Sequence, residues 1–173
     1  MLSADIQNRF RAFALSVLVA ASLGGCFQPM YGGTSGQALV EDFRAIKVEP
    51  ISERIGHFLG NELIFVLNGT GSTVQPRYRL LVSVRQRVQA PLVDTVSGRA
   101  TSGMLIVDAD YRLLPVSGGE PIASGVAFVT ASYDRSSQRF ANLRAARDAE
   151  IRSARSLADQ IRVRLAADLS RRK

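Results

Sequence analysis

The sequence predicts an α+β fold, a two-layer sandwich in which a four-stranded, mostly antiparallel sheet carries two helices on one face. Three stretches within residues 77–133 show an alternation of period two, which is typical of strands. The first alternates apolar and polar residues, the second has one apolar and one partly polar face, and the third alternates larger with small residues. One segment before them and one long segment after them repeat apolar residues every three or four positions, as amphipathic helices do. With a short apolar stretch at the start, the order is β-α-β-β-β-α, which favours helices packed against one sheet.

Residues 1–25 have the pattern of a bacterial signal peptide. Arg9 and Arg11 precede an apolar run over residues 12–21, which is shorter than the roughly 20 apolar residues that a membrane span needs. We therefore expect this segment to direct export and to be removed.

Leu23, Gly24 and Gly25 stand directly before Cys26, the only cysteine of the chain. This arrangement resembles the lipobox of bacterial lipoproteins, which are cleaved before the cysteine. The resemblance implies a diacylglycerol on the Cys26 thiol, a further acyl chain on its amine, and no other cofactor. A secreted protein with an ordinary cleavage site is the alternative. A single cysteine also excludes disulfides within the chain and thiolate metal clusters.

Residues 26–42 are expected to form a lipidated, flexible tether, because glycine, serine and proline recur there without periodicity. A single folded domain over residues 43–173 is expected to follow. It begins with a short strand at residues 43–49, which Pro50 closes.

The first helix is expected from Ser52 to about Leu67. Ser52 is a suitable N-terminal cap, and Asn68 with Gly69 provides a C-terminal stop. Apolar residues repeat at spacings of three and four between these ends. They are Ile55, Leu59, Leu63, Val66 and Leu67.

Three strands are expected over residues 77–90, 100–114 and 122–133. The loops between them, at residues 91–98 and 115–121, are of hairpin size and contain proline and glycine. The three strands should therefore pair as an antiparallel meander.

The last helix is expected over residues 137–170, a stretch without proline or glycine. Residues 138–147 fit its apolar stripe less well, and we expect them to project beyond the sheet. The stripe consists of Ile151, Ala154, Ala158, Ile161, Leu165 and Leu169.

The formal charge is +7, and only Lys47 and Lys173 among the basic residues are not arginine. Arginine binds phosphate and carboxylate oxygens through its planar fork, so an anionic lipid or an acidic protein surface is the expected partner. A GC-rich genome would also favour arginine, and that alternative stays open. Nucleic acid is not an expected partner of an exported lipoprotein.

The most concentrated cationic feature is one face of the strand at residues 77–90, which carries Arg77, Arg79, Arg85 and Arg87. The opposite face is apolar and is expected to face the core. We interpret the arginine row as a candidate surface for an anion or a partner protein. A solvated outer face of an antiparallel sheet is the alternative.

The residue sets that catalysis or metal binding requires are missing. His57 is the only histidine, which excludes a histidine-based metal site, and no Gly-x-Ser-x-Gly motif occurs. Asp108 and Asp110 share one face of a strand beside Arg112. Cross-strand ion pairs are expected there instead of a calcium site or a catalytic carboxylate pair. We expect a binding protein that is neither an enzyme nor a metalloprotein.

Three segments resemble the lipopolysaccharide-assembly lipoproteins LptE, also called RlpB. Residues 26–32 (Cys-Phe-Gln-Pro-Met-Tyr-Gly) are similar to the start of the mature family members, with Met30 where leucine is usual. Residues 109–113 (Ala-Asp-Tyr-Arg-Leu) and 131–141 (Ala-Ser-Tyr-Asp-Arg-Ser-Ser-Gln-Arg-Phe-Ala) are similar to the alphaproteobacterial branch. The resemblance covers essentially the whole chain.

The resemblance implies an outer-membrane lipoprotein that plugs the β-barrel translocon LptD, supports its assembly and binds lipopolysaccharide during delivery to the cell surface. Phe27 is not the aspartate associated with retention in the inner membrane. The alternative is a stand-alone lipoprotein that binds or shuttles anionic lipid in an apolar pocket. Candidates to line such a pocket are the small residues Ala123, Gly125, Ala127 and Ala131.

Overall fold

The computed structural model describes residues 33–69, 74–90 and 101–172. Within these ranges the elements are α2 (Gly33–Arg44), β1 (Ile46–Val48), α3 (Arg54–Asn68), β2 (Tyr78–Gln89), β3 (Ser102–Pro115), β4 (Ala123–Asp134) and α4 (Arg139–Ser170). Residues 38–173 form one compact unit, which contains the sheet and the helices α3 and α4.

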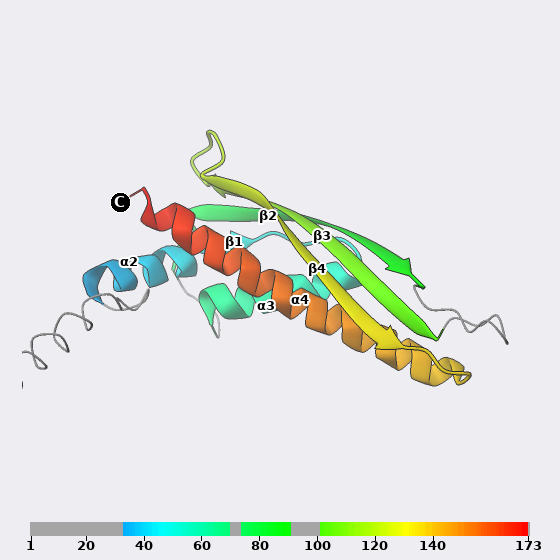
Figure 1. Cartoon of the computed structure of the whole chain (residues 1–173). Coiled ribbons are helices and arrows are strands. Elements are labelled where there is room, and N and C mark those ends of the chain that lie inside the picture. The colour runs from blue at the N-terminus through cyan, green and yellow to red at the C-terminus, as the bar shows by residue number, and fades with distance from the viewer. Residues whose placement is uncertain (1–32, 70–73, 91–100, 173) are drawn as a thin grey trace, which may run out of the picture. The chain divides into compact units, whose positions relative to one another are not determined.

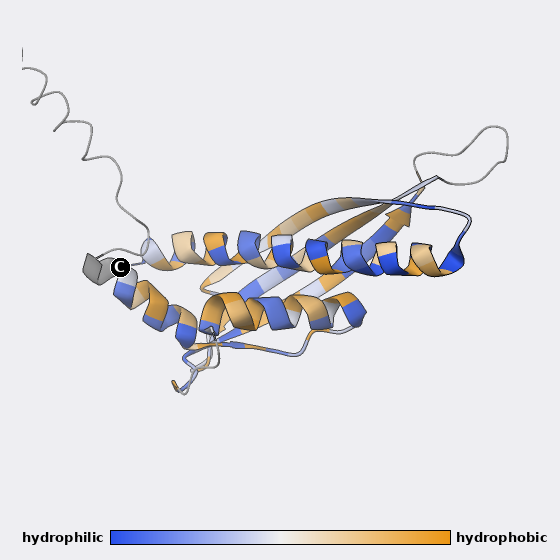
Figure 2. Ribbon diagram, turned by 90° about the horizontal axis from the view of Figure 1, so that it is seen from below, coloured by the Kyte–Doolittle hydropathy of each residue, from blue (hydrophilic) through white to orange (hydrophobic). Residues whose placement is uncertain are grey.

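The four strands form one sheet in the order β1-β2-β3-β4. Strands β2, β3 and β4 pair antiparallel as the predicted meander, whereas β1 runs parallel to β2 over Tyr78–Leu80. The parallel pair is possible because α3 provides the crossover between β1 and β2. Helices α3 and α4 lie side by side on one face of the sheet (Figure 1, Figure 2). The predicted α+β class is therefore confirmed.

Helix α3 carries its predicted apolar stripe into the core. Ile55, Leu59 and Leu63 are completely buried, and their spacing of four residues places them on one side of the helix. The helix ends at Asn68, and Gly69 follows with φ 65° and donates its N–H to the carbonyl of Phe65. The stop predicted from Asn68 and Gly69 is thus confirmed.

The start of α3 differs from the prediction. The helix begins at Arg54, and Glu53 occupies the capping position without a side-chain cap bond, so the cap predicted at Ser52 is wrong. The incoming chain instead packs tightly on the first turn, since a Cβ at Gly56 would lie 2.7 Å from Cγ2 of Ile51. This close approach explains the glycine at position 56 and the buried Ile51.

Helix α4 packs against the edge strand β4 through small residues on both elements. Ala154 and Ala158 of α4 are completely buried, and Ala123, Ala127 and Ala131 of β4 are buried as well. Alanines on both sides let the two backbones approach closely at the density typical of protein interiors. The small residues of β4 are therefore part of the core and do not line an apolar pocket.

The core does not extend to the far end of β2. Leu80, near its start, is completely buried, whereas Val88, which was predicted to face the core, is 61% exposed. The 15 residues of α3 rise only about 1.5 Å each, whereas the 12 residues of β2 rise about 3.3 Å each, so the helix is shorter in length than the strand that it covers. The last residues of β2 therefore lie outside the cover that the helices provide.

Residues 33–42 correct the predicted tether. They belong to helix α2, in which Leu39 and Phe43, four residues apart, are buried in the core. The carboxylate of Asp42 is also buried and accepts a hydrogen bond of 2.8 Å from Arg77. Tertiary contacts of one helical face thus outweigh the low helix propensity of the glycines in this segment. Residues 26–32 of the predicted tether lie outside the described residues.

Tyr111 is the largest polar side chain of the sheet core. It stands opposite Gly125 of β4, where an added Cβ would lie 2.8 Å from the Tyr111 hydroxyl oxygen. The glycine therefore makes room for the ring. The same pairing recurs between Gly103 and Tyr133, where a Cβ would collide with the tyrosine ring.

We expect the Tyr111→Phe variant to lose less stability than the wild type at alkaline pH. Burial raises the pKa of the Tyr111 hydroxyl, with Asp168 adding to the shift and Arg164 opposing it. The neutral hydroxyl stabilises the folded state fully below the unfolded pKa of about 10, and this contribution is lost as the pH rises toward the higher folded pKa. Urea unfolding over a pH series measures the effect, and an unchanged alkaline decline in the variant would contradict it.

Candidate functional site

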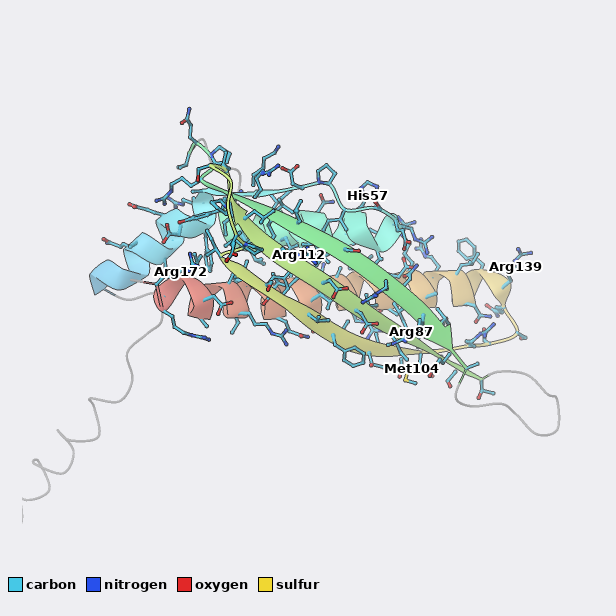
Figure 3. The ribbon with its side chains drawn as sticks, turned by 90° about the horizontal axis from the view of Figure 1, so that it is seen from above. His57, Arg87, Met104, Arg112, Arg139 and Arg172 are labelled. Atoms are coloured by element: carbon cyan, nitrogen blue, oxygen red, sulfur yellow. The ribbon has the colours of Figure 1, made fainter. Side chains whose placement is uncertain are left out.

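The face of the sheet that points away from α3 and α4 is the main exposed surface of this layer, and we call it the outer face. It consists of alternate residues of β2, β3 and β4, because successive side chains of a strand point to opposite faces. Figure 3 looks onto this face and labels Arg87 and Arg112. Its members include Arg79, Arg85, Arg87, Asp108, Asp110, Arg112, Val126 and Phe128.

The predicted cross-strand ion pairs are present on the outer face. Arg85 donates to Asp110 over 2.8 Å, and Arg87 donates to Asp108 over 3.3 Å. In the register Arg85 stands directly opposite Asp108, and Arg87 stands opposite Ile106. Each arginine therefore pairs with the aspartate that lies diagonally across from it. The two aspartates are therefore engaged in ion pairs with arginines. Among the described residues they belong to no cluster of side chains that could bind a metal ion.

The predicted row of four arginines occupies three different environments. Arg85 and Arg87 are paired across strands, and Arg77 lies just before β2 in an ion pair with Asp42 of α2. Arg79 forms no ion pair with any residue that the structure describes. The row is uniformly cationic along β2, but β3 supplies acidic partners, so much of the outer face has mixed charge.

A depression of about 270 Å³ opens on the outer face where β1 diverges from β2. It is lined by Glu49, Pro50, Leu81, Val82, Ser83, Asp110 and Arg112. Clefts that hold drug-sized ligands measure roughly 300–1,000 Å³, so this depression is too small for several acyl chains. Arg112 is exposed beside it and pairs with no carboxylate of the described residues. The lining thus combines the guanidinium of Arg112 with the carboxylates of Glu49 and Asp110, which pair with Lys47 and Arg85.

His57 lies in the first turn of α3 and is exposed. It therefore belongs to the helical layer, whereas Asp108 and Asp110 point away from that layer on the other side of the sheet. The structure does not bring the histidine and the two aspartates together. The prediction of a surface or partly buried histidine is confirmed.

The first turns of α4 form a second exposed feature, which we call the α4 tip (residues 139–147). Phe140 is 72% exposed and Leu143 is 61% exposed, and Arg144 lies over the Phe140 ring at 5.8 Å. The first buried residue of α4 is Ala149, so the predicted projection beyond the sheet is confirmed. Figure 3 shows Arg139 at this end of the helix and Arg172 at the other.

The α4 tip combines exposed apolar side chains with cations and carries no acidic residue before Asp148. Arg147 extends this cationic surface toward α3, with its guanidinium 5.8 Å from the centre of the Phe58 ring. Such a surface suits an amphiphile with an anionic head group, because apolar side chains enter the lipid while arginines meet the charge. In the sequence, this surface corresponds to a stretch around Phe140 that contains several arginines and no acidic residue. The helical periodicity of apolar residues did not identify it as a binding surface.

No protein-family model and no curated protein matches this sequence. None of the helices within the described ranges combines the length and apolar character that crossing a bilayer requires. Among solved structures, a lipoprotein from Caulobacter crescentus CB15 is 24% identical with a TM-score of 0.65, over 78% of this chain and 97% of that one.

Two further solved structures have the same fold at lower identity. A minor lipoprotein from Acinetobacter baumannii is 16% identical with a TM-score of 0.52, over 72% of this chain and 91% of that one. Lipoprotein B from Nitrosomonas europaea is 17% identical with a TM-score of 0.53, over 72% and 82%. The chain therefore shares its fold with bacterial lipoproteins of several species.

Proposed function

We propose that this protein is a lipoprotein of the LptE type, anchored in the outer membrane through acyl chains on Cys26. In this role it partners and plugs an LptD-type β-barrel, supports the assembly of that barrel and helps to deliver lipopolysaccharide to the cell surface. It acts as a binding protein, without catalysis and without a cofactor beyond its own lipid. The observation that carries the proposal is the fold shared with bacterial lipoproteins across 97% of the Caulobacter chain.

The surface of the domain supports this role. The lumen of a large β-barrel is polar, and the outer face offers paired charges at Arg85 with Asp110 and at Arg87 with Asp108. The α4 tip adds exposed arginines together with Phe140 and Leu143. Phosphorylated lipid would find both cations and apolar side chains at that end.

The test is recovery of a barrel from the native membrane. The tagged protein, purified from detergent-solubilised outer membranes, should bring down a large β-barrel, and depletion of the protein should reduce lipopolysaccharide at the cell surface. Recovery of no barrel, together with normal lipopolysaccharide export after depletion, would contradict the proposal.

Binding of anionic lipid without a barrel is the second candidate function, and the α4 tip is the observation that favours it. The purified protein should then bind vesicles of anionic phospholipid. We expect Arg139→Gln with Arg144→Gln to weaken binding about 30-fold, because each surface arginine contributes about 1 kcal/mol near an anionic membrane. Arg171→Gln with Arg172→Gln is the matched control, since it removes the same charge at the opposite end of α4.

The two functions give different results in these experiments. A barrel recovered with the tip variant as well as with the wild type supports the role as a plug, independently of lipid binding. Equal vesicle binding by the tip variant and the control variant would contradict lipid recognition by the tip.

A further inference from the structure

The two edges of the sheet are treated differently by the rest of the fold. Strand β4 forms one edge, and β1 with the remainder of β2 forms the other. An open strand edge exposes unpaired N–H and C=O groups, which another strand can pair with. The state of each edge therefore decides where this domain can accept a further strand.

The β4 edge is covered by side chains of α4. Arg152 donates to the carbonyl of Ser132 over 3.3 Å, and Gln160 donates to the carbonyl of Phe128 over 3.0 Å. Arg164 donates to the carbonyl of Val126. All three carbonyls belong to even-numbered residues of β4, and the backbone groups of every second residue point to the same side of a strand. They therefore all face the free edge. The helix thus occupies acceptors that an added strand would need.

Among the described residues, no strand pairs with the β2 edge beyond Leu80. Strand β1 pairs with only Tyr78–Leu80 of the twelve-residue β2, and the last contact is a hydrogen bond of 3.0 Å from the N–H of Glu49 to the carbonyl of Leu80. Even-numbered residues of β2 therefore turn their backbone groups to this edge. Beyond Val82, they are Val84, Gln86 and Val88, of which Gln86 and Val88 are exposed.

We propose that the edge of β2 at Val84–Val88 accepts an extended segment of another protein, in which apolar and acidic residues alternate. The segment adds a fifth strand next to β2, by the main-chain pairing that other sheet edges use to bind peptides. The N–H and C=O groups of Val84, Gln86 and Val88 form no hydrogen bond across this edge to any residue that the structure describes, and they would pair with the segment. This binding does not depend on the proposed function and goes beyond it.

The chemistry of the segment follows from the side chains of β2. Arg85 and Arg87 point to the outer face, are 70% and 64% exposed, and use only one terminal nitrogen each for Asp110 and Asp108. An arginine has five N–H donors, so each can donate to a second carboxylate from a strand on its free side. On the other face of β2, the exposed Val88 favours apolar neighbours.

A second copy of this chain does not fit the same edge. Strand β2 reads Tyr-Arg-Leu-Leu-Val-Ser-Val-Arg-Gln-Arg-Val-Gln and contains no acidic residue. Two β2 edges paired with each other would place arginines of one copy beside arginines of the other, and like charges on neighbouring strands are destabilising. The occupant is therefore a heterologous segment that carries carboxylates.

The test uses the mature protein in detergent and a synthetic peptide of alternating valine and glutamate. We expect binding to slow amide hydrogen exchange at least tenfold at Val84, Gln86 and Val88 and to leave the amides of β4 unchanged. A peptide of alternating valine and lysine should bind at least tenfold more weakly. Protection at β4, or equal binding of the two peptides, would overturn the proposal.

A proline in the edge provides the variant. Gln86→Pro removes an N–H that faces the free edge and spares the hydrogen bonds between β2 and β3, as prolines at sheet edges do. It should abolish binding of the acidic peptide, whereas Thr130→Pro at the β4 edge should not change it. The acidic peptide N-methylated at every amide gives a test that needs no variant, since it should not bind. Self-association of the protein through β2 without peptide would also overturn the proposal.

Discussion

Replacing Cys26 with serine is expected to abolish incorporation of fatty acid into the protein and to release it from the membrane. In the predicted lipobox of Leu23, Gly24 and Gly25, the thiol is the nucleophile expected to carry the diacylglycerol. Each buried CH₂ group of an acyl chain contributes about 0.8 kcal/mol to membrane binding, so the loss of several chains removes an effectively permanent anchor. Labelling of cells with a radioactive fatty acid, followed by purification of the protein, measures the change.

A control separates the position of the thiol from its mere presence. The double variant Cys26→Ser with Ser52→Cys keeps one cysteine but moves it to an exposed position before α3. It should remain unlabelled, because the lipid is attached only at the end of the signal peptide. An unlabelled wild-type protein would contradict the predicted anchor and favour a secreted protein with an ordinary cleavage site.

Leu157→Ala is expected to destabilise the domain by about 2–5 kcal/mol, the range for leucine truncation in a packed core. Leu157 is completely buried in the middle of α4, where the helix packs against the sheet and α3. The truncated side chain leaves a cavity because the neighbouring backbone relaxes only in part. Urea unfolding of the purified protein, followed by circular dichroism, measures the free energy of unfolding.

Leu143→Ala is the matched control, because it makes the same chemical change on the same helix at a residue that is 61% exposed. It should alter the free energy of unfolding by no more than about 0.5 kcal/mol, as surface substitutions usually do. Similar losses for the two variants would mean that the α4 tip is packed and does not project. A stable Leu143→Ala variant also allows the tip to be tested in lipid binding without an effect on folding.

Most elements of the domain were predictable because their signals are local. The spacing of Ile55, Leu59 and Leu63 indicated α3, and its end at Asn68 was recognisable from Gly69. The alternating residues of β2, β3 and β4 and the short loops indicated the antiparallel meander that the structure contains. Each of these patterns reflects the geometry of a single helix, strand or turn.

Other features depended on residues far apart in the chain. Helix α2 was missed because its glycines resemble a linker, and only the burial of Leu39 and Phe43 against the core makes the helix stable. The arginine row was recognisable on one strand, but its partners Asp108 and Asp110 lie more than 20 residues away in the sequence. Their diagonal pairing could not be derived before the register of β2 and β3 was known.

The sequence by itself determined the fold class, the meander and the cationic side chains of β2. It also predicts the lipobox at residues 23–26, which lie outside the described residues. The tertiary structure alone decided which arginines are paired, which end of α4 is uncovered and which sheet edge stays open. The physical reason is that periodicity and turn chemistry act within a few residues, whereas charge pairing and edge protection require a particular strand register and helix position. Strand β1 ends at Val48, opposite Leu80, and no local pattern in β2 marks that point.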